Sequence, residues 1–194
     1  MYSKYDITTA KWGEVKEMGH YDMAILPWGA TEPHNLHLPY CTDMLTAQAV
    51  AFEVAEKAAM QGVNLMVLPG IPLGSQNPGQ IELPYCIHTS QTTQMAILRD
   101  VVRSLKRQGI RKLMIMSGHG GNNFKGIIRD IMIEDPEMII VHNEWFAIIP
   151  RTDYFEEKED DHAGELETSV MLHYYPDLVR MDLAGDGQFS KFGI

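Results

Sequence analysis

The sequence predicts an α/β protein in which helices cover both faces of a mainly parallel sheet. Short apolar runs alternate with long amphipathic segments, and loops rich in glycine and proline separate them. Alternation at this spacing favours right-handed crossovers between parallel strands. The chain has 194 residues, 45% of them hydrophobic and 22% charged, which is enough for one sizeable core. We therefore expect a single domain over residues 1–194.

The first strand and the first helix flank a stretch rich in polar side chains. Residues 23–26 are an apolar run stopped by a proline and a glycine, so they are expected to form a strand. A helix is expected over residues 43–60, because Thr42 can cap it and apolar residues recur until Gly62. Asp43 therefore lies in the first turn of this helix.

The second strand is expected over residues 65–68, where an apolar run leads into a long loop of turn-forming residues. The next helix is expected to begin at Thr89 or Ser90, since either hydroxyl can cap it, and to end at Gln108 before a glycine. The third strand, residues 112–116, runs straight into the loop SGHGGNN.

The last predicted elements repeat the same alternation. A helix over residues 123–134 is expected to be capped by Asn122 and Asn123 and to end at an Asp-Pro pair. The fourth strand is expected over residues 138–141, and the final helix over residues 163–175, where a proline breaks it. The loops that follow the four strands should all meet at the carboxyl edge of the sheet.

Composition and charge exclude several classes of function. The formal net charge of −10 disfavours a nucleic-acid partner, which needs clustered lysine and arginine. No apolar run approaches the roughly 20 residues of a membrane span, and the N-terminus lacks the apolar core of a signal peptide. The two cysteines, Cys41 and Cys86, form neither a metal-spaced nor a redox pair. We expect a cytoplasmic protein without membrane or nucleic-acid partners.

Four side chains are expected to converge where the strands end: Glu32, His34, Asp43 and His119. Imidazole nitrogens and carboxylate oxygens suit zinc, manganese or iron, and a bridging carboxylate can hold two ions. The alternative is a purely structural role, in which Glu32 caps a turn and Asp43 stabilises a helix N-terminus. Glycines in SGHGGNN could cradle phosphate, but the spacing matches no phosphate-binding motif, so they more plausibly let backbone approach a ligand.

The final helix offers two glutamates, of which only one can face the site. At 100° per residue, Glu165 and Glu167 point about 200° apart. Glu167 shares its stripe with the apolar residues Val170, Met171 and Tyr174, so it should point inward, where a carboxylate needs a metal or hydrogen bonds. His162 precedes the helix and can act as an acid or base.

Three motifs together resemble the creatininase (creatinine amidohydrolase) family: EPHNLHLPYCTD from Glu32 to Asp43, SGHGGN from Ser117 to Asn122, and HAGELETS from His162 to Ser169. The resemblance implies a three-layer α/β/α fold, a homo-oligomer such as a hexamer, and hydrolysis of cyclic or linear amides with two divalent ions. It implies one ion on Glu32, Asp43 and His119, and a second on His34 with Asp43 bridging. It also makes His162 the catalytic histidine.

This chain departs from the family pattern at several positions. Gly121 stands where creatininase has a glutamate ligand, and Glu167 is the candidate to replace it as a ligand. The substrate pocket is expected to include Trp145 and, from a loop that departs from the family pattern, Ser75. His37 is expected to orient a ligand. Related proteins continue with another helix, so the ending SKFGI suggests a truncated copy.

The sequence therefore predicts a metal-dependent amidohydrolase that cleaves a small non-peptide amide other than creatinine. His162 and Glu167 are the residues expected to act in catalysis, with a metal-activated water as nucleophile. Gly121 motivates one alternative, a non-catalytic metal-binding or regulatory protein derived from the family. Phosphate-ester hydrolysis is a weaker alternative, because the motif loops hold no lysine or arginine.

Overall fold

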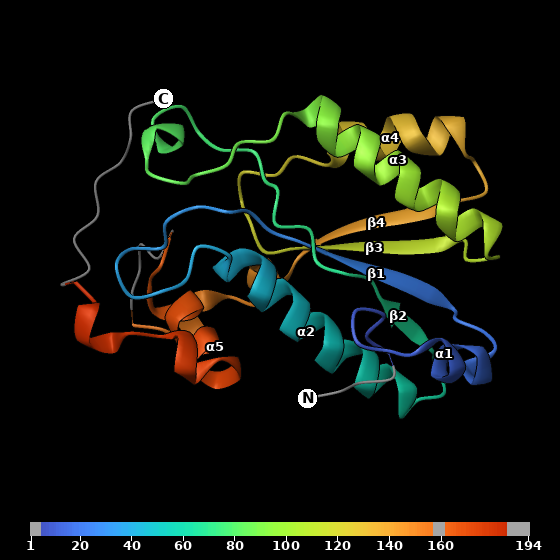
Figure 1. Cartoon of the computed structure of the whole chain (residues 1–194), viewed down its shortest axis with the longest axis horizontal. Coiled ribbons are helices and arrows are strands. Elements are labelled where there is room, and N and C mark those ends of the chain that lie inside the picture. The colour runs from blue at the N-terminus through green and yellow to red at the C-terminus, as the bar shows by residue number, and fades with distance from the viewer. Residues whose placement is uncertain (1–4, 157–161, 186–194) are drawn as a thin grey trace.

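A computed structural model gives the architecture of residues 5–156 and 162–185 (Figure 1). In chain order the helices and strands are α1 (Trp12–Met18), β1 (Met23–Trp28), α2 (Thr42–Ala59), β2 (Leu65–Val67), α3 (Gln91–Arg107), β3 (Lys112–Ser117), α4 (Lys125–Glu134), β4 (Ile139–Glu144) and α5 (Glu165–Tyr174). The expected chain end at residues 190–194 lies outside the described residues.

All four described strands are parallel, in the order β2-β1-β3-β4. The central strand β1 is buried from its second residue onward, as expected for a strand covered on both faces, whereas the edge strand β4 alternates between exposed and buried residues at its start. The register pairs Trp28 with Ser117, and Ser117 with Glu144. Three strands therefore end level with one another, and the loops after them start from one edge.

Helices cover both faces of this sheet, which confirms the predicted three-layer arrangement (Figure 1). On one face, α3 and α4 contribute Leu98 and Ile131 to a core with Leu113. On the other face, three alanines of α2 (Ala47, Ala51 and Ala55) pack against Ile25 and Val67. The small alanine side chains let α2 lie close to the sheet, and α5 packs against α2 in turn.

Two expectations about helix caps were wrong, and α1 was not among the expected elements. Thr42 does not cap α2 but forms its first residue, and its hydroxyl donates to the carbonyl of Pro39. Neither Asn122 nor Asn123 is the N-cap of α4, because the helix begins at Lys125 and Phe124 precedes it. The Asn122 amide joins separate loops instead. The choice between Thr89 and Ser90 is settled in favour of Ser90, whose hydroxyl accepts from the Thr93 amide at 3.4 Å.

None of the helices in the described residues combines the length and the apolar character that a membrane crossing requires.

Candidate metal centre

The N-terminus of α2 brings Asp43 to the carboxyl edge of the sheet. Gly118, directly after β3, makes this approach possible, because a Cβ there would lie 2.1 Å from the main-chain oxygen of Asp43. The missing side chain at Gly118 therefore allows close packing of α2, whereas the sequence predicted close approach of a ligand. The loop between β1 and α2 carries Glu32 and His34 to the same place, and both side chains are buried.

Asp43 lies at the centre of the resulting cluster. One of its carboxylate oxygens, Oδ1, is 2.7 Å from His34 Nε2, and the other, Oδ2, is 3.1 Å from His119 Nδ1. His119 Nδ1 is also 2.9 Å from Glu32 Oε1, and Glu167 Oε1 lies 3.9 Å from His34 Nε2. No donor is well aligned with the buried Asp43 Oδ2 in the described part of the chain. Residues from four separate segments therefore share one polar cluster.

Three histidines at this site, His34, His119 and His162, each have one ring nitrogen paired with a main-chain carbonyl. His34 Nδ1 lies 3.0 Å from the Glu32 oxygen, His119 Nε2 lies 2.8 Å from the Ser75 oxygen, and His162 Nε2 lies 2.6 Å from the Pro33 oxygen. A carbonyl only accepts hydrogen bonds, so each of these nitrogens donates and the other nitrogen keeps a free lone pair when the ring is neutral. Metal-binding histidines are fixed in this way.

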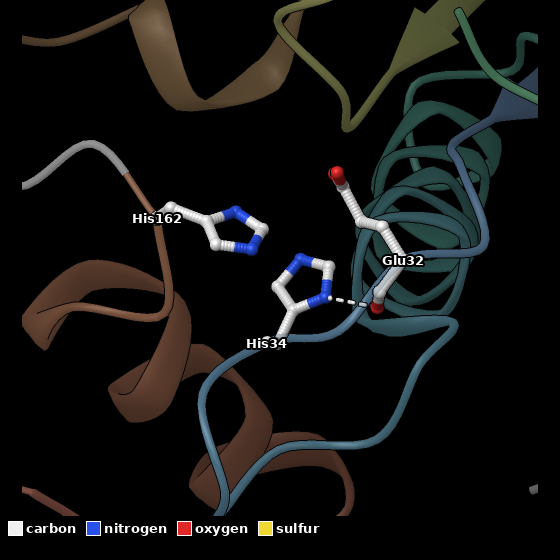
Figure 2. A group of neighbouring side chains, drawn as sticks. All are labelled: Glu32, His34 and His162. Atoms are coloured by element: carbon white, nitrogen blue, oxygen red, sulfur yellow. Dashed lines mark hydrogen bonds between the residues drawn. The ribbon is translucent and has the colours of Figure 1, made fainter. Parts of the chain in front are cut away.

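Figure 2 shows how His34 and His162 meet although they come from distant segments. His34 and Glu32 extend from the loop after β1, and His162 comes from the segment that enters α5. The two imidazole rings lie 4.2 Å apart between centroids with an angle of 37° between their planes. His162 therefore packs directly on a predicted ligand.

The electrostatics of this cluster favour added positive charge. Burial lowers the pKa of His34, but the charge and hydrogen bond of Asp43 outweigh it and raise the pKa to about 9. Burial likewise opposes protonation of His119, yet hydrogen bonds to Asp43 and Glu32 raise its pKa to about 10. Burial would raise the pKa of Asp43, but the two histidines hold it well below its ordinary value. For Glu167, burial raises the pKa of the carboxyl.

The donor set fits divalent cations. Glu32, Asp43 and His119 can each offer one atom within 4.8 Å of the others, and so can His34, Asp43 and Glu167. Asp43 belongs to both groups, as a bridging carboxylate would. Buried carboxylates that hold protons on nearby histidines, with one oxygen lacking an aligned donor, are well suited to bind cations of the zinc and manganese type. A third group, Glu32, His34 and His162, meets the same distance limit.

A cavity of about 300 Å³ opens onto this cluster. Its walls include Asp43, His119, His162 and Glu167, together with the glycine loop after β3. A small molecule in this cavity would therefore contact the predicted ligands and the predicted proton carrier together.

A family comparison now identifies the group of proteins to which this site belongs. The family model described as creatininase, creatinine amidohydrolase, matches residues 8–194. The chain belongs to the creatininase family. It is 30% identical over 187 residues to creatinine amidohydrolase of Pseudomonas putida, covering 87% of this chain and 70% of that protein. It is also 30% identical to the mycofactocin precursor peptide peptidase of Mycolicibacterium smegmatis, covering 82% of this chain and only 61% of that relative.

Solved structures of the creatininase family agree with this assignment. A Bacteroides fragilis protein proposed to be a creatinine amidohydrolase is 55% identical, with a TM-score of 0.96, and the match covers all of this chain and 77% of that one. Creatininase with manganese is 26% identical, with a TM-score of 0.82, over 98% of this chain and 80% of that one. The predicted family and fold are thus confirmed.

Gly121 stands where the structure leaves no room for a side chain. A Cβ at Gly121 would lie 2.4 Å from the Ser75 oxygen and 2.5 Å from His119 Nε2. These two atoms form the hydrogen bond that orients the His119 ring. Any side chain at this position would therefore push apart the pair that aims His119 at Glu32 and Asp43.

We expect Gly121→Glu, which places a glutamate where the sequence resemblance implies one, to weaken metal binding by about 10- to 100-fold, the range for losing a partner that orients a ligand. Competition with a chelator under Zn²⁺ or Mn²⁺ measures this affinity. The matched control is Gly120→Ala, because no atom lies within 4 Å of a Cβ at Gly120. Tighter metal binding by Gly121→Glu would contradict the prediction.

Gln80 is a site residue that the sequence analysis missed. It begins the short 3₁₀ helix η1 (Gln80–Glu82), lines the cavity, and donates from Nε2 to Glu32 Oε2 at 3.0 Å. Its Oε1 accepts from the Asn77 amide at 3.3 Å, which fixes the orientation of the side chain. The two oxygens of Glu32 are thus divided, one facing His119 and the other held by Gln80.

Replacing Gln80 with leucine should lower metal affinity by about tenfold, because the Glu32 carboxylate would lose the donor that holds it. Calorimetric titration of the metal-free protein with Mn²⁺ measures the change. The exposed Gln108 provides a matched control as Gln108→Leu. An unchanged dissociation constant for Gln80→Leu would show that Glu32 is held by other contacts.

The remaining predicted residues occupy more varied positions. Ser75 reaches the site through its main-chain oxygen, since its hydroxyl donates to Thr89. Trp145 packs on the α2 side of the core, and its neighbour Phe146 lines the cavity. His37 Nε2 lies 2.9 Å from the hydroxyl of Thr168 on α5, one residue after Glu167. The contacts of Ser75 and His37 suit positioning roles around the cluster, whereas Trp145, predicted for the substrate pocket, is not among the described residues that line the cavity.

Proposed function

We propose that this protein is a divalent-metal-dependent amidohydrolase that cleaves a non-peptide C–N amide bond in a small molecule other than creatinine. The observation that carries the proposal is the shared geometry of the histidines. Each of them gives one N–H to a main-chain carbonyl, and two of them turn the other nitrogen toward buried carboxylates. Family membership, with relatives that hydrolyse amide bonds, supports the same reaction class.

In this proposal two ions bind. Glu32, Asp43 and His119 would hold one, and His34, Asp43 and Glu167 the other, the ions being zinc, manganese or iron. Bound ions of this kind polarise an amide carbonyl and lower the pKa of water toward neutrality. Glu167 then serves as the substitute for the glutamate that Gly121 replaces. Its Oε2 accepts from the Ala163 amide at 2.6 Å, which would keep Oε1 on the His34 side.

His162 would move the proton in this reaction. Because its Nε2 donates to the Pro33 carbonyl, Nδ1 is the nitrogen that can accept a proton and pass it to the leaving nitrogen. Leu166 at the cavity wall gives the substrate an apolar contact, and the buried setting of the carboxylates limits water around the reacting bond.

A metal-removal experiment tests the proposal. The protein is stripped with a chelator, reloaded with Mn²⁺ or Zn²⁺, and assayed against small linear and cyclic amides and, in parallel, phosphate esters. We expect amide hydrolysis that disappears on stripping and returns on reloading, with about two ions per chain by elemental analysis. Full metal content without any amide turnover would favour the non-catalytic alternative, and turnover of esters of phosphate alone would favour a phosphoesterase.

A further inference from the structure

The cavity has a second wall, to which Phe146 and Arg151 contribute from the stretch that follows β4. Phe146 lies on the 3₁₀ helix η2 (Trp145–Ala147), and Arg151 begins the 3₁₀ helix η3 (Arg151–Asp153). Trp145 packs into the core beside α2 and so ties η2 to the body of the protein. The Phe146 ring is thereby presented to the cavity by a neighbour that is itself anchored.

Arg151 brings a permanent positive charge to this wall. It is partly buried, and its guanidinium carbon lies 5.9 Å from the centre of the Phe146 ring, within reach of a cation–π contact. Of the described residues that line the cavity, Arg151 alone is a lysine or arginine. The sequence motifs hold no such residue, so only the fold reveals a cation beside the site.

The guanidinium on this wall can bind an anion. A guanidinium is planar, remains charged at all relevant pH values, and donates two parallel hydrogen bonds to a carboxylate or a phosphate. The ring of Phe146 adds an apolar surface beside it. The volume of about 300 Å³ lies at the small end of ligand pockets, so the anion and the amide would belong to one compact molecule.

We propose that Arg151 and Phe146 form a subsite for an anionic group, a carboxylate or a phosphate, on the amide substrate. This inference rests on the proposed amide hydrolysis and narrows its substrate class. The anionic group binds to the subsite and orients the substrate, and the bond that is cleaved is the amide bond. Arg151 then determines specificity, and the metal-binding side chains act on the amide.

Matched compounds of the same size test the subsite with the metal-loaded protein. N-formylglycine carries a carboxylate, N-formylaminomethylphosphonate a phosphate-like group, and N-formylglycinamide no charge; pyroglutamate and 2-pyrrolidinone form a cyclic pair. We expect a higher kcat/KM for the anionic members, and a loss of about 10- to 100-fold for them alone in Arg151→Met, the usual effect of removing a charged hydrogen bond. The preferred anion distinguishes a carboxylate substrate from a phosphorylated one. Arg151→Lys should keep part of the preference.

The exposed Arg103 on α3 supplies the control variant Arg103→Met, which should behave as wild type. The inference is overturned if the wild-type protein hydrolyses neutral members as well as anionic ones, or if Arg151→Met keeps the preference; amide hydrolysis then still stands. If no compound is hydrolysed, the proposed function fails. Calorimetric titration with N-formylglycine then tests whether the anionic subsite exists. Weaker binding to Arg151→Met supports it, and equal affinities overturn it.

Discussion

Replacing Asp43 with asparagine is expected to remove both metal ions and to reduce amide hydrolysis below detection. Asp43 is the one carboxylate shared by both predicted ion groups, and its two oxygens face His34 and His119 separately. Asparagine keeps the shape but loses the charge and places an NH₂ group against one of these partners. Affinity should fall by more than about 100-fold, the upper range for residues that merely orient ligands.

Elemental analysis after dialysis measures this loss, and circular dichroism checks that the fold persists. Asp100→Asn is the control, because Asp100 is an exposed aspartate on α3. Glu167→Gln tests the sharing of Asp43 more finely, since Glu167 belongs to one group only. That variant should lose about one ion of two. Full metal occupancy in Asp43→Asn would exclude Asp43 as the bridge.

The sheet and its main helices could be predicted because burial leaves a direct mark on the sequence. β1 is buried along nearly all its length and reads as a continuous apolar run. The missed helix α1 has only seven residues and none of them is buried, so the spacing of Trp12, Val15 and Met18 is too short a pattern to predict a helix.

The two wrong caps have different causes. The Thr42 hydroxyl donates to the Pro39 carbonyl three residues earlier, which is a local alternative to capping. The Asn122 amide bonds to loops distant in the sequence, and local pattern does not reveal such contacts.

The candidate metal ligands could be predicted from the sequence, but the residues that surround them could not. Glu32, His34 and Asp43 lie in one short stretch after a strand, and parallel topology fixes where such a stretch ends. Gln80 and Arg151 lie in long connections whose paths depend on packing, so no spacing rule brings them to the site. Gly121 was recognised as a departure from the family, but its contact with the His119–Ser75 pair needed three dimensions.

Replacing His162 with alanine should lower kcat by about 10²- to 10⁴-fold, the usual worth of a general acid or base, while metal content stays unchanged. The metal measurement is decisive, because His162 also lies in a possible ion-binding group with Glu32 and His34. A proton carrier can be removed without loss of metal. A ligand cannot, so an ion lost from His162→Ala would reassign this residue to the metal centre.

His162→Phe separates proton transfer from packing. The His162 ring covers His34 at 4.2 Å between centroids, and phenylalanine keeps a ring there without any nitrogen. If His162 acts only by holding His34 in place, phenylalanine should preserve much of the activity that alanine loses. If Nδ1 carries the proton, both variants should fail equally, and added imidazole should restore turnover in the alanine variant, where the vacated space opens to the cavity. We expect the second result, because the Pro33 carbonyl fixes Nε2 as a donor and leaves Nδ1 as the only nitrogen of His162 that can accept a proton.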